Sequence, residues 1–453
     1  MFTAFHSKLP ARCSCLLAFT IPVLLGLYWP MTGLGFSWIP GATRIGIFSC
    51  VGVLAVLWST APVTRRERQW TAVLAGYLAL LTVPVLFAAV TTRACTNWIR
   101  VGFLLAFCLV LARAFRHPGT RRAFGTSSLL MSLLLSVYIL GCYLSFVGPV
   151  LPTYESTRIF KESVLVSLGV GLNPLAFSCA FSGILAACIL PPSKLLSATL
   201  AMIVAISTVF TGSRTPLALM AACVFGVAAI ELLRRRTALR WTCLGLLLAA
   251  LLAVAAYQAK GGLDMQRWSA ITEGRVNLWA VAWEKFLERP LTGYGADSWG
   301  DDLVSRMPSH YQISSELIQG HVGGYHNTYL TLLAEEGVVV FAFAIFLLWR
   351  GFRTIEDSLD PSTGQTWPRR IYLFAFLFLT CRGLVEVPGI FGYGQDPAEF
   401  GAYALLALMI SLPSASRITA RPARAGLEAG GRRSLGNFRY TQLGLVTPVG
   451  LKP

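Results

Sequence analysis

Charged residues are scarce in this sequence. Only 13% of its 453 residues are Asp, Glu, Lys or Arg, while 55% are hydrophobic and the mean hydropathy is +0.62. Soluble domains average about 25% charged residues, so this composition excludes an ordinary soluble protein and indicates a membrane protein. The chain also lacks the usual metal-binding motifs, since it contains no HExxH, no DxD and no Cys/His cluster.

Apolar runs long enough to cross a bilayer recur along the chain. A transmembrane helix needs about 20 mostly apolar residues. The first run follows a basic start without a convincing cleavage site, so we interpret it as a span rather than a signal peptide. The sequence therefore predicts an all-α polytopic membrane protein with about twelve transmembrane helices. The predicted spans are 13–29, 42–60, 70–90, 98–115, 127–149, 164–190, 195–212, 215–232, 241–257, 328–349, 371–389 and 398–412.

Basic residues predict the orientation of these spans. They follow the even-numbered spans, and loops rich in Arg and Lys stay in the cytoplasm. The net charge of +17 is thereby interpreted as a topology signal rather than as a nucleic-acid-binding surface. Both termini are predicted to be cytoplasmic. The basic residues concerned are Arg65, Arg66, Arg68, Arg113, Arg116, Arg121, Arg122, Lys194, Arg234, Arg235, Arg236, Arg240, Arg350, Arg353, Arg369 and Arg370.

One outward loop differs from the others. It is about 70 residues long, carries charges of both signs and contains several aromatic residues. Long loops without structure are uncommon and usually functional, so we expect a partly helical loop domain. The predicted division of the chain is transmembrane helices 1–9 in 1–257, the loop domain in 258–327, transmembrane helices 10–12 in 328–412, and a basic, disordered cytoplasmic tail in 413–453.

The loop contains an amphipathic helical pattern. Val276, Trp279, Trp283 and Phe286 share one face at helical spacing, and Pro290 ends the pattern. Tryptophan favours the boundary between membrane and water. The pattern therefore predicts a helix that lies in the membrane interface.

Three basic groups are expected on the outer side. Arg214 lies in the tight turn between spans seven and eight, where it runs against the positive-inside bias, although a topology residue that snorkels is the alternative. Arg275 begins the interfacial helix, where a solvated charge is the alternative. His326 stands where the loop returns to the membrane; a lone histidine is usually structural. At a helix start, however, the dipole favours neutral imidazole, which can accept a proton.

These three residues are distant in sequence, yet the predicted topology puts them at one membrane depth on one side. Two arginines can hold a pyrophosphate through paired hydrogen bonds. A neutral histidine can act as general base for a hydroxyl group. Such a set needs no metal ion.

Further ionisable residues lie inside predicted spans. Glu335 and Glu336 are in span ten, and Arg382 and Glu386 are spaced i, i+4 in span eleven. Charges inside a span are costly and are candidates for function, but an Arg–Glu pair that holds helices together is an equal alternative. The glycines of the turn 293–295 indicate a close approach of two backbones.

Several of these motifs together resemble the bacterial O-antigen ligase and polymerase family. The resemblance covers 205–350 in motif detail and the whole chain in topology, and it implies a GT-C-like fold. The matching residues are Thr211-Gly212-Ser213-Arg214-Thr215-Pro216, Gly274-Arg275, Trp279, Pro290-Leu291-Thr292-Gly293-Tyr294-Gly295, His326-Asn327-Thr328-Tyr329-Leu330, Leu333 and Glu336-Gly337.

The resemblance implies a metal-independent, inverting glycosyltransferase of the bacterial inner membrane with its active face in the periplasm. Such a ligase uses no cofactor and moves a glycan from undecaprenyl diphosphate to a hydroxyl group of lipid A–core. Carried over by position, Arg214 and Arg275 bind the donor diphosphate and His326 activates the acceptor hydroxyl. The other residues expected to bind substrate are Asn327, Gly293, Gly295 and Glu336.

Other functions compete with this interpretation. An O-antigen or exopolysaccharide polymerase of the same family shares the loop pattern. A transporter or flippase places substrate groups near the bilayer midplane at broken helices, whereas the candidate groups here lie at the outer edge. A membrane scaffold without catalysis would tolerate the loss of His326.

Overall fold

Every regular element that the structure describes is a helix. The computed structural model describes residues 2–33, 39–59, 61–88, 90–150, 152, 156, 159–160, 172–211, 214–235, 275–296, 298, 325–359, 366–384, 391 and 397–413. The helices all belong to one unit, Met1–Leu412, and nothing of the second unit, Pro413–Pro453, is described beyond its first residue. The structure therefore does not test the predicted tail.

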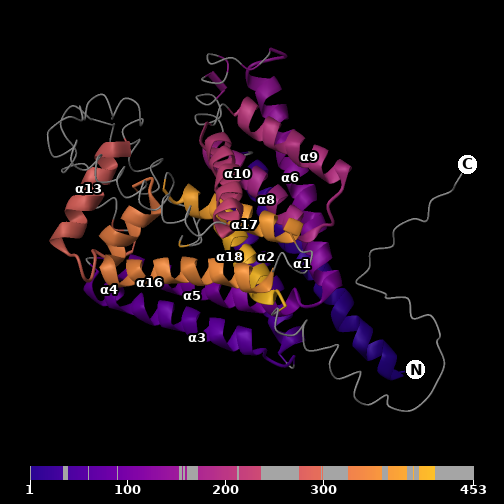
Figure 1. Ribbon diagram of the computed structural model, residues 1–453, viewed down its shortest axis with the longest axis horizontal. Helices are drawn as coiled ribbons and strands as arrows, with labels where there is room; N and C mark the ends of the chain where they lie inside the picture. Colours follow the sequence, from indigo (N-terminus) through magenta and orange to yellow (C-terminus); the bar gives the residue numbers. More distant parts are fainter. Residues whose placement is uncertain are drawn as a thin grey trace, which may run out of the picture. The chain divides into compact units, whose positions relative to one another are not determined.

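The helices follow the apolar runs of the sequence (Figure 1). Each predicted span contains one, except 241–257, which lies outside the described residues. The helices are α1 (Phe2–Gly33), α2 (Ile39–Trp58), α3 (Arg65–Leu80), α4 (Thr82–Phe87), α5 (Thr91–Ala114), α6 (Pro118–Phe146), α8 (Leu172–Ile189), α9 (Lys194–Ala205), the π-helical turn η1 (Ile206–Phe210), α10 (Arg214–Arg235), α13 (Arg275–Glu288), α16 (Thr328–Ser358), α17 (Thr366–Arg382) and α18 (Pro397–Ser411).

Four helical segments of the described chain are long and apolar enough to cross a membrane. They are Arg65–Phe87, formed by α3 and α4, and the helices α5, α6 and α16. Shorter apolar helices accompany them, among them Pro174–Ile189 and Glu399–Ser411. The fold is thus all-helical and that of a membrane protein. The number of twelve spans and the sidedness of the loop stay predictions.

The third predicted span is not one uninterrupted helix. It is divided at Leu81 into α3 and α4. Pro84 is the third residue of α4, and a proline has no N–H for the carbonyl four residues earlier and also clashes with it. The interruption therefore follows from Pro84.

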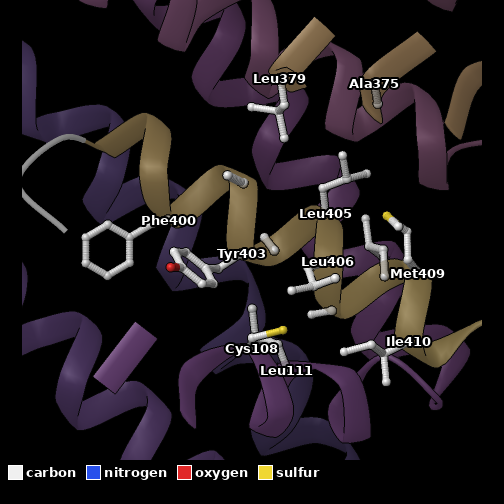
Figure 2. Packing of buried hydrophobic residues seen from close by; sticks show 14 of the residues in the cluster. Cys108, Leu111, Ala375, Leu379, Phe400, Tyr403, Leu405, Leu406, Met409 and Ile410 are labelled. Atoms are coloured by element: carbon white, nitrogen blue, oxygen red, sulfur yellow. The ribbon is translucent and has the colours of Figure 1, made fainter. Parts of the chain in front are cut away.

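Helix α18 lies in the centre of the helical packing. Its residues from Gly401 to Ile410 are all buried, as expected for a helix that is apolar on every side. Figure 2 shows its side chains between Cys108 and Leu111 of α5 and Ala375 and Leu379 of α17.

Two ends of the molecule can be distinguished by their contacts. At the first, Gly295 packs against Ala88 just before α5, and the start of α16 is bonded to Gly383 at the end of α17. We call this the His326 end. At the other, Arg66 donates hydrogen bonds to the Ser358 hydroxyl and the Leu412 carbonyl. We call this the Glu67 end.

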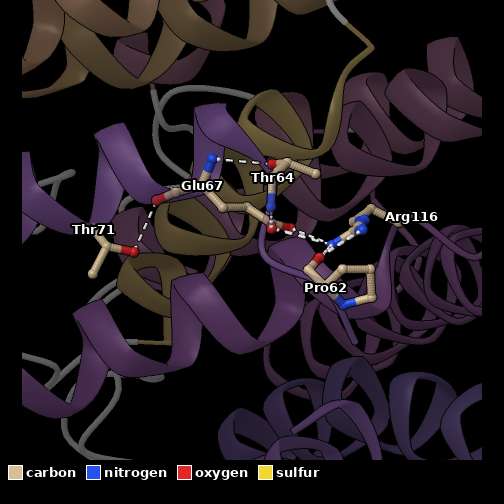
Figure 3. A network of polar contacts seen from close by, with 5 residues as sticks. All are labelled: Pro62, Thr64, Glu67, Thr71 and Arg116. Atoms are coloured by element: carbon tan, nitrogen blue, oxygen red, sulfur yellow. Dashed lines mark hydrogen bonds and ion pairs between the residues drawn. The ribbon is translucent and has the colours of Figure 1, made fainter. Parts of the chain in front are cut away.

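The Glu67 end is held by a network of polar groups (Figure 3). Thr64 caps α3 by accepting from the Glu67 N–H at 3.1 Å, and the Glu67 carboxylate accepts from the Thr64 N–H at 2.7 Å. Arg116, which follows α5, donates to the same carboxylate at 3.0 Å and to the Pro62 carbonyl at 2.9 Å. The carboxylate is thereby both a helix cap and the partner of a cation.

Candidate functional site

His326 precedes helix α16 by two residues. The cap of α16 is Asn327, whose side-chain oxygen accepts from the N–H groups of Tyr329 and Leu330 at 3.0 Å each. His326 is half-buried and has φ of +50°, which makes it the one residue other than glycine in the left-handed region among those described. Such a conformation costs about 1–2 kcal/mol in a residue with a side chain, so the contacts around it must hold it in place.

Those contacts come from the end of α17. The Thr328 N–H donates to the Gly383 carbonyl at 2.7 Å, and the Asn327 side-chain N–H donates to the Leu384 carbonyl at 3.0 Å. The hydroxyl of the next residue, Tyr329, donates to the Thr380 carbonyl at 2.7 Å. The backbone that follows His326 is therefore fixed to a second helix.

Arg275 is the first residue of α13 and is half-buried. One turn later, Leu278 joins a buried apolar cluster with Val281 and Ala282 of the same helix. Tyr325, the neighbour of His326, is fully buried in that cluster. Arg275 and His326 therefore flank one piece of apolar core.

Helix α16 is broken at Gly337, which has φ of 78° and ψ of 173° inside an otherwise helical stretch. The break leaves the carbonyls of Ala334 and Glu335 and the N–H of Val338 without their partners inside the helix. The turn after α13 supplies hydrogen-bond partners for all three groups. Tyr294 N–H donates to Ala334 at 3.1 Å, Gly295 N–H donates to Glu335 at 2.8 Å, and Val338 N–H donates to the Pro290 carbonyl at 2.8 Å. Unpaired backbone groups are very costly in a membrane protein, so the two segments stabilise each other.

Three glycines make this approach possible. We call the contact between 290–295 and 334–338 the backbone interlock. Gly293, Gly295 and Gly337 all have positive φ, and a Cβ atom on any of them would overlap neighbouring atoms, which belong to Glu335, Ala88 and Leu291 respectively. The close approach of two backbones predicted for the turn 293–295 is confirmed, and its partner is another part of the protein.

Arg214 begins helix α10, and its side chain is not among those described. Helix α10 runs antiparallel to α17, because Glu231 near its end pairs with Arg369 near the start of α17 and Gly226 faces Leu377. The start of α10 therefore lies toward Arg382, at the His326 end. The structure places Arg214, Arg275 and His326 at this end, while the meeting of their side chains around one diphosphate stays a prediction.

The other ionisable residues predicted inside spans are deeply buried. Glu335 and Glu336 stand directly before the break at Gly337, with exposed fractions of 0% and 2%. Arg382 is also buried, and its guanidinium carbon lies 3.4 Å from the ring centre of Phe177. Glu386, its predicted partner, lies outside the described residues.

Helix α13 has two faces with different surroundings. The helix itself is confirmed, but its buried face is formed by Asn277, Leu278, Val281, Ala282 and Lys285. The predicted apolar face includes Trp283, which is 47% exposed. The buried face packs against α16, while the predicted aromatic face is turned away from that contact. Contact of the exposed face with the membrane interface stays a prediction.

Two basic residues that were not predicted are Lys285 on this helix and Arg289 directly after it. The Lys285 amine is fully buried, donates to the Ser298 carbonyl at 2.9 Å and lies 5.1 Å from the ring centre of Tyr294. Arg289 stacks on the same ring at 4.6 Å, and the Tyr294 hydroxyl donates to Glu288. The spacing of Lys285 four and seven residues after Val281 and Leu278 was the signal that it shares their buried face.

Comparison with known families gives a match over the segment that carries these features. A family model described as O-Antigen ligase matches residues 198–347, about a third of the chain. Over these residues the chain matches the O-antigen ligase and polymerase family. No curated protein matches the chain.

The O-antigen ligase segment contains most of the candidate site. It begins in α9 and ends in α16, so it includes Arg214, Arg275, His326 and both halves of the backbone interlock. It ends before α17 and α18. Those helices hold the start of α16 and form the centre of the helical packing.

Proposed function

We propose that this protein is an O-antigen ligase-type glycosyltransferase. It moves a glycan from undecaprenyl diphosphate to a hydroxyl group of lipid A–core on the periplasmic face of the bacterial inner membrane. The family match over 198–347 supports this reaction class, and the apolar helices support a location in a membrane. The donor and the acceptor follow from the resemblance of the sequence motifs.

In this proposal the reaction is a single in-line displacement. The acceptor hydroxyl oxygen attacks the anomeric carbon, while the bond from that carbon to the diphosphate oxygen breaks. His326 takes the hydroxyl proton, and undecaprenyl diphosphate leaves with the bonding electron pair. Arg214 and Arg275 hold the diphosphate and stabilise its developing charge, the largest electrostatic demand of such a reaction. These two guanidinium groups supply the positive charge, so the proposed mechanism is metal-independent and inverts the anomeric centre.

The observation that best supports the proposal is the backbone interlock. It fixes the end of α13 to α16 through three hydrogen bonds of 2.8–3.1 Å, while Tyr325 and Leu278 share one core cluster. Arg275 and His326 are therefore attached to backbones that cannot shift independently. Charged groups that are positioned in advance stabilise a transition state without reorganising during the reaction.

The remaining predicted substrate-binding residues surround the same backbone. Asn327 caps α16 beside His326, and Gly293, Gly295 and Glu336 belong to the interlock. In this proposal these four residues maintain the backbone geometry of the site and line the space for the bound glycan.

Replacement of the proposed base is the direct test. His326→Ala should abolish glycan transfer, because no other group at that position accepts the hydroxyl proton. The measurement is the lipopolysaccharide ladder of a deletion strain that carries the variant, with membrane abundance determined in parallel. His117→Asn is the matched control, because His117 caps α6 at the Glu67 end and asparagine preserves a cap. A normal ladder with His326→Ala would remove the catalytic assignment.

The deletion strain also separates a ligase from the alternative, a polymerase of the same family. Loss of all O-antigen together with accumulation of lipid-linked polymer indicates a ligase. A core that carries a single repeat unit indicates a polymerase. The two outcomes differ on one gel and need no variant.

A further inference from the structure

Helix α5 carries a polar face near its start. Arg93, Asn97 and Arg100 are spaced i, i+4 and i+7 and therefore share one side of the helix. Helix α5 is a candidate membrane span, and Arg100 lies about 13 Å along it from Thr91 at 1.5 Å per residue. An arginine at this depth is a candidate for function.

Asn97 and Arg100 form a pair that offers only hydrogen-bond donors. Arg100 donates to the Asn97 side-chain oxygen at 2.9 Å, which uses the acceptor of the amide and turns its nitrogen away. Asn97 is 1% exposed, and its side-chain nitrogen has no hydrogen-bond partner. In the part of the chain that the structure describes, Arg100 forms no ion pair. Since a guanidinium has five N–H donors and stays charged, the half-buried Arg100 has donors left for acceptor atoms from outside the chain.

Further along α5 from this pair, on the side away from the helix start, the side chains are apolar and buried. Leu104, one turn further along α5, is 1% exposed, and Phe107 packs edge-on against Phe400 of α18 at 5.6 Å. The start of α5 belongs to the His326 end because Gly295 packs on Ala88. Helical side chains point toward the helix start, so the guanidinium of Arg100 reaches toward the level of lipid headgroups.

The opposite end of the same helix shows how this protein treats an arginine that serves the fold. Arg116 donates to the Glu67 carboxylate at 3.0 Å and to the Pro62 carbonyl at 2.9 Å. Its charge is balanced within the chain. The half-buried Arg100 has only the neutral amide of Asn97 as its hydrogen-bond partner. The side-chain nitrogen of Asn97 is a buried donor without an acceptor, which costs about 1–3 kcal/mol.

We propose that Asn97 and Arg100 form an anion site that binds the phosphate group of a membrane lipid. A phosphate oxygen supplies only acceptors, carries the complementary charge and lies at the depth that Arg100 reaches. Arg93, on the same face and nearer the helix start, extends the site toward solvent. The site includes none of the proposed catalytic residues, and its ligand is either a bulk phospholipid or a phosphorylated lipid substrate.

Lipid binding to the purified full-length protein in detergent tests this proposal. Native mass spectrometry would measure the affinities for phosphatidylglycerol, lipid A, undecaprenyl diphosphate and, as a lipid without phosphate, diacylglycerol. The variants are Arg100→Gln, which removes the charge, and Asn97→Asp, which supplies Arg100 with a carboxylate from the protein itself. The control is Arg122→Gln, because Arg122 is exposed on α6 near its start, at the Glu67 end.

We expect both variants to weaken the binding of at least one phosphate lipid by about tenfold or more, the loss expected for charge-assisted hydrogen bonds. Arg122→Gln should leave it unchanged, and the lipid that is affected identifies the source of the phosphate. Asn97→Asp keeps the test decisive if Arg100→Gln fails to fold, because its new ion pair preserves the fold. Equal affinities in Asn97→Asp and the unaltered protein, or equal binding of diacylglycerol and the phosphate lipids, would overturn the proposal. Binding alone is measured, so the result does not depend on glycan transfer.

Discussion

The two ends of the helical unit use the same side chains in different ways. At the Glu67 end, cations contact anions of the chain itself, as Arg116 contacts Glu67 and Arg369 contacts Glu231 and Glu356. At the His326 end, Arg100 contacts only a neutral amide. Arg116 and Arg369 therefore serve stability, whereas Arg100 is proposed to bind a ligand.

The two ends also differ in backbone conformation, which is regular at the Glu67 end and unusual at the His326 end. At the Glu67 end, α3 begins with a regular capping box. At the His326 end, α16 is interrupted at Gly337, and His326 and three glycines have positive φ. Unfavourable backbone conformations gather at functional sites because the surrounding structure holds them there. The comparison predicts that substitutions at the His326 end impair function and that those at the Glu67 end impair stability.

The largest effect is expected from Gly337→Ala. The conformation of Gly337 is almost restricted to glycine, and the added methyl group would overlap the Leu291 carbonyl. The backbone interlock should open, with a loss of about 3 kcal/mol or more in the free energy of unfolding. Glycan transfer should fall by about 100-fold, since a displacement of about 1 Å is enough for that. Transfer in membrane preparations and thermal unfolding in detergent measure the two quantities.

Gly52→Ala in α2 is the control for this variant. No atom lies within 4 Å of the position of its Cβ, so the methyl group fits. Alanine in place of a helical glycine should stabilise by about 0.5–1 kcal/mol. If Gly337→Ala behaved like Gly52→Ala, the backbone interlock would have no role in holding the site.

An effect confined to stability, with no specific loss of glycan transfer, is expected from Arg369→Met. The guanidinium is fully buried between Glu231 and Glu356, so its removal leaves two carboxylates without their cation. The loss should be about 3–5 kcal/mol in the free energy of unfolding. Additional Glu231→Gln and Glu356→Gln substitutions should restore part of it. Arg353→Met is the control, because its ion pair with Asp357 is about half exposed and contributes at most about 0.5 kcal/mol.

The smallest effect is expected from Thr64→Ala. This change removes the side-chain oxygen that accepts from the Glu67 N–H and should lower the free energy of unfolding by about 1 kcal/mol. Thr64→Ser preserves the oxygen and should leave stability unchanged. Glycan transfer per folded molecule should be equal in both variants. A selective loss of transfer in Thr64→Ala would contradict the division between the two ends.

Much of the helical structure could be predicted from the sequence. Apolar runs indicated the helices because a segment surrounded by lipid must satisfy its backbone groups internally. Val276 to Phe286 and the proline at 290 indicated α13. The position of His326 beside the start of a helix followed from the polar residues that precede an apolar run.

Other features could not be predicted from local patterns. The pattern of span ten reads as one continuous helix, yet it breaks at Gly337 because the distant turn 290–295 supplies partners for the freed backbone groups. Periodicity indicated one aromatic face on α13, and only the tertiary structure showed that a second face, with Leu278, Val281 and Ala282, is buried. No local pattern singled out Asn97 and Arg100, which form a hydrogen bond in the folded protein.

The sequence by itself determined that this is an all-helical membrane protein and which residues can carry chemistry, because hydrophobicity and residue type are local properties. The tertiary structure decided which segments meet. Each hydrogen bond of the backbone interlock joins residues about 40 or more positions apart. Such contacts depend on the simultaneous packing of several helices, so no short stretch of sequence contains the information that specifies them.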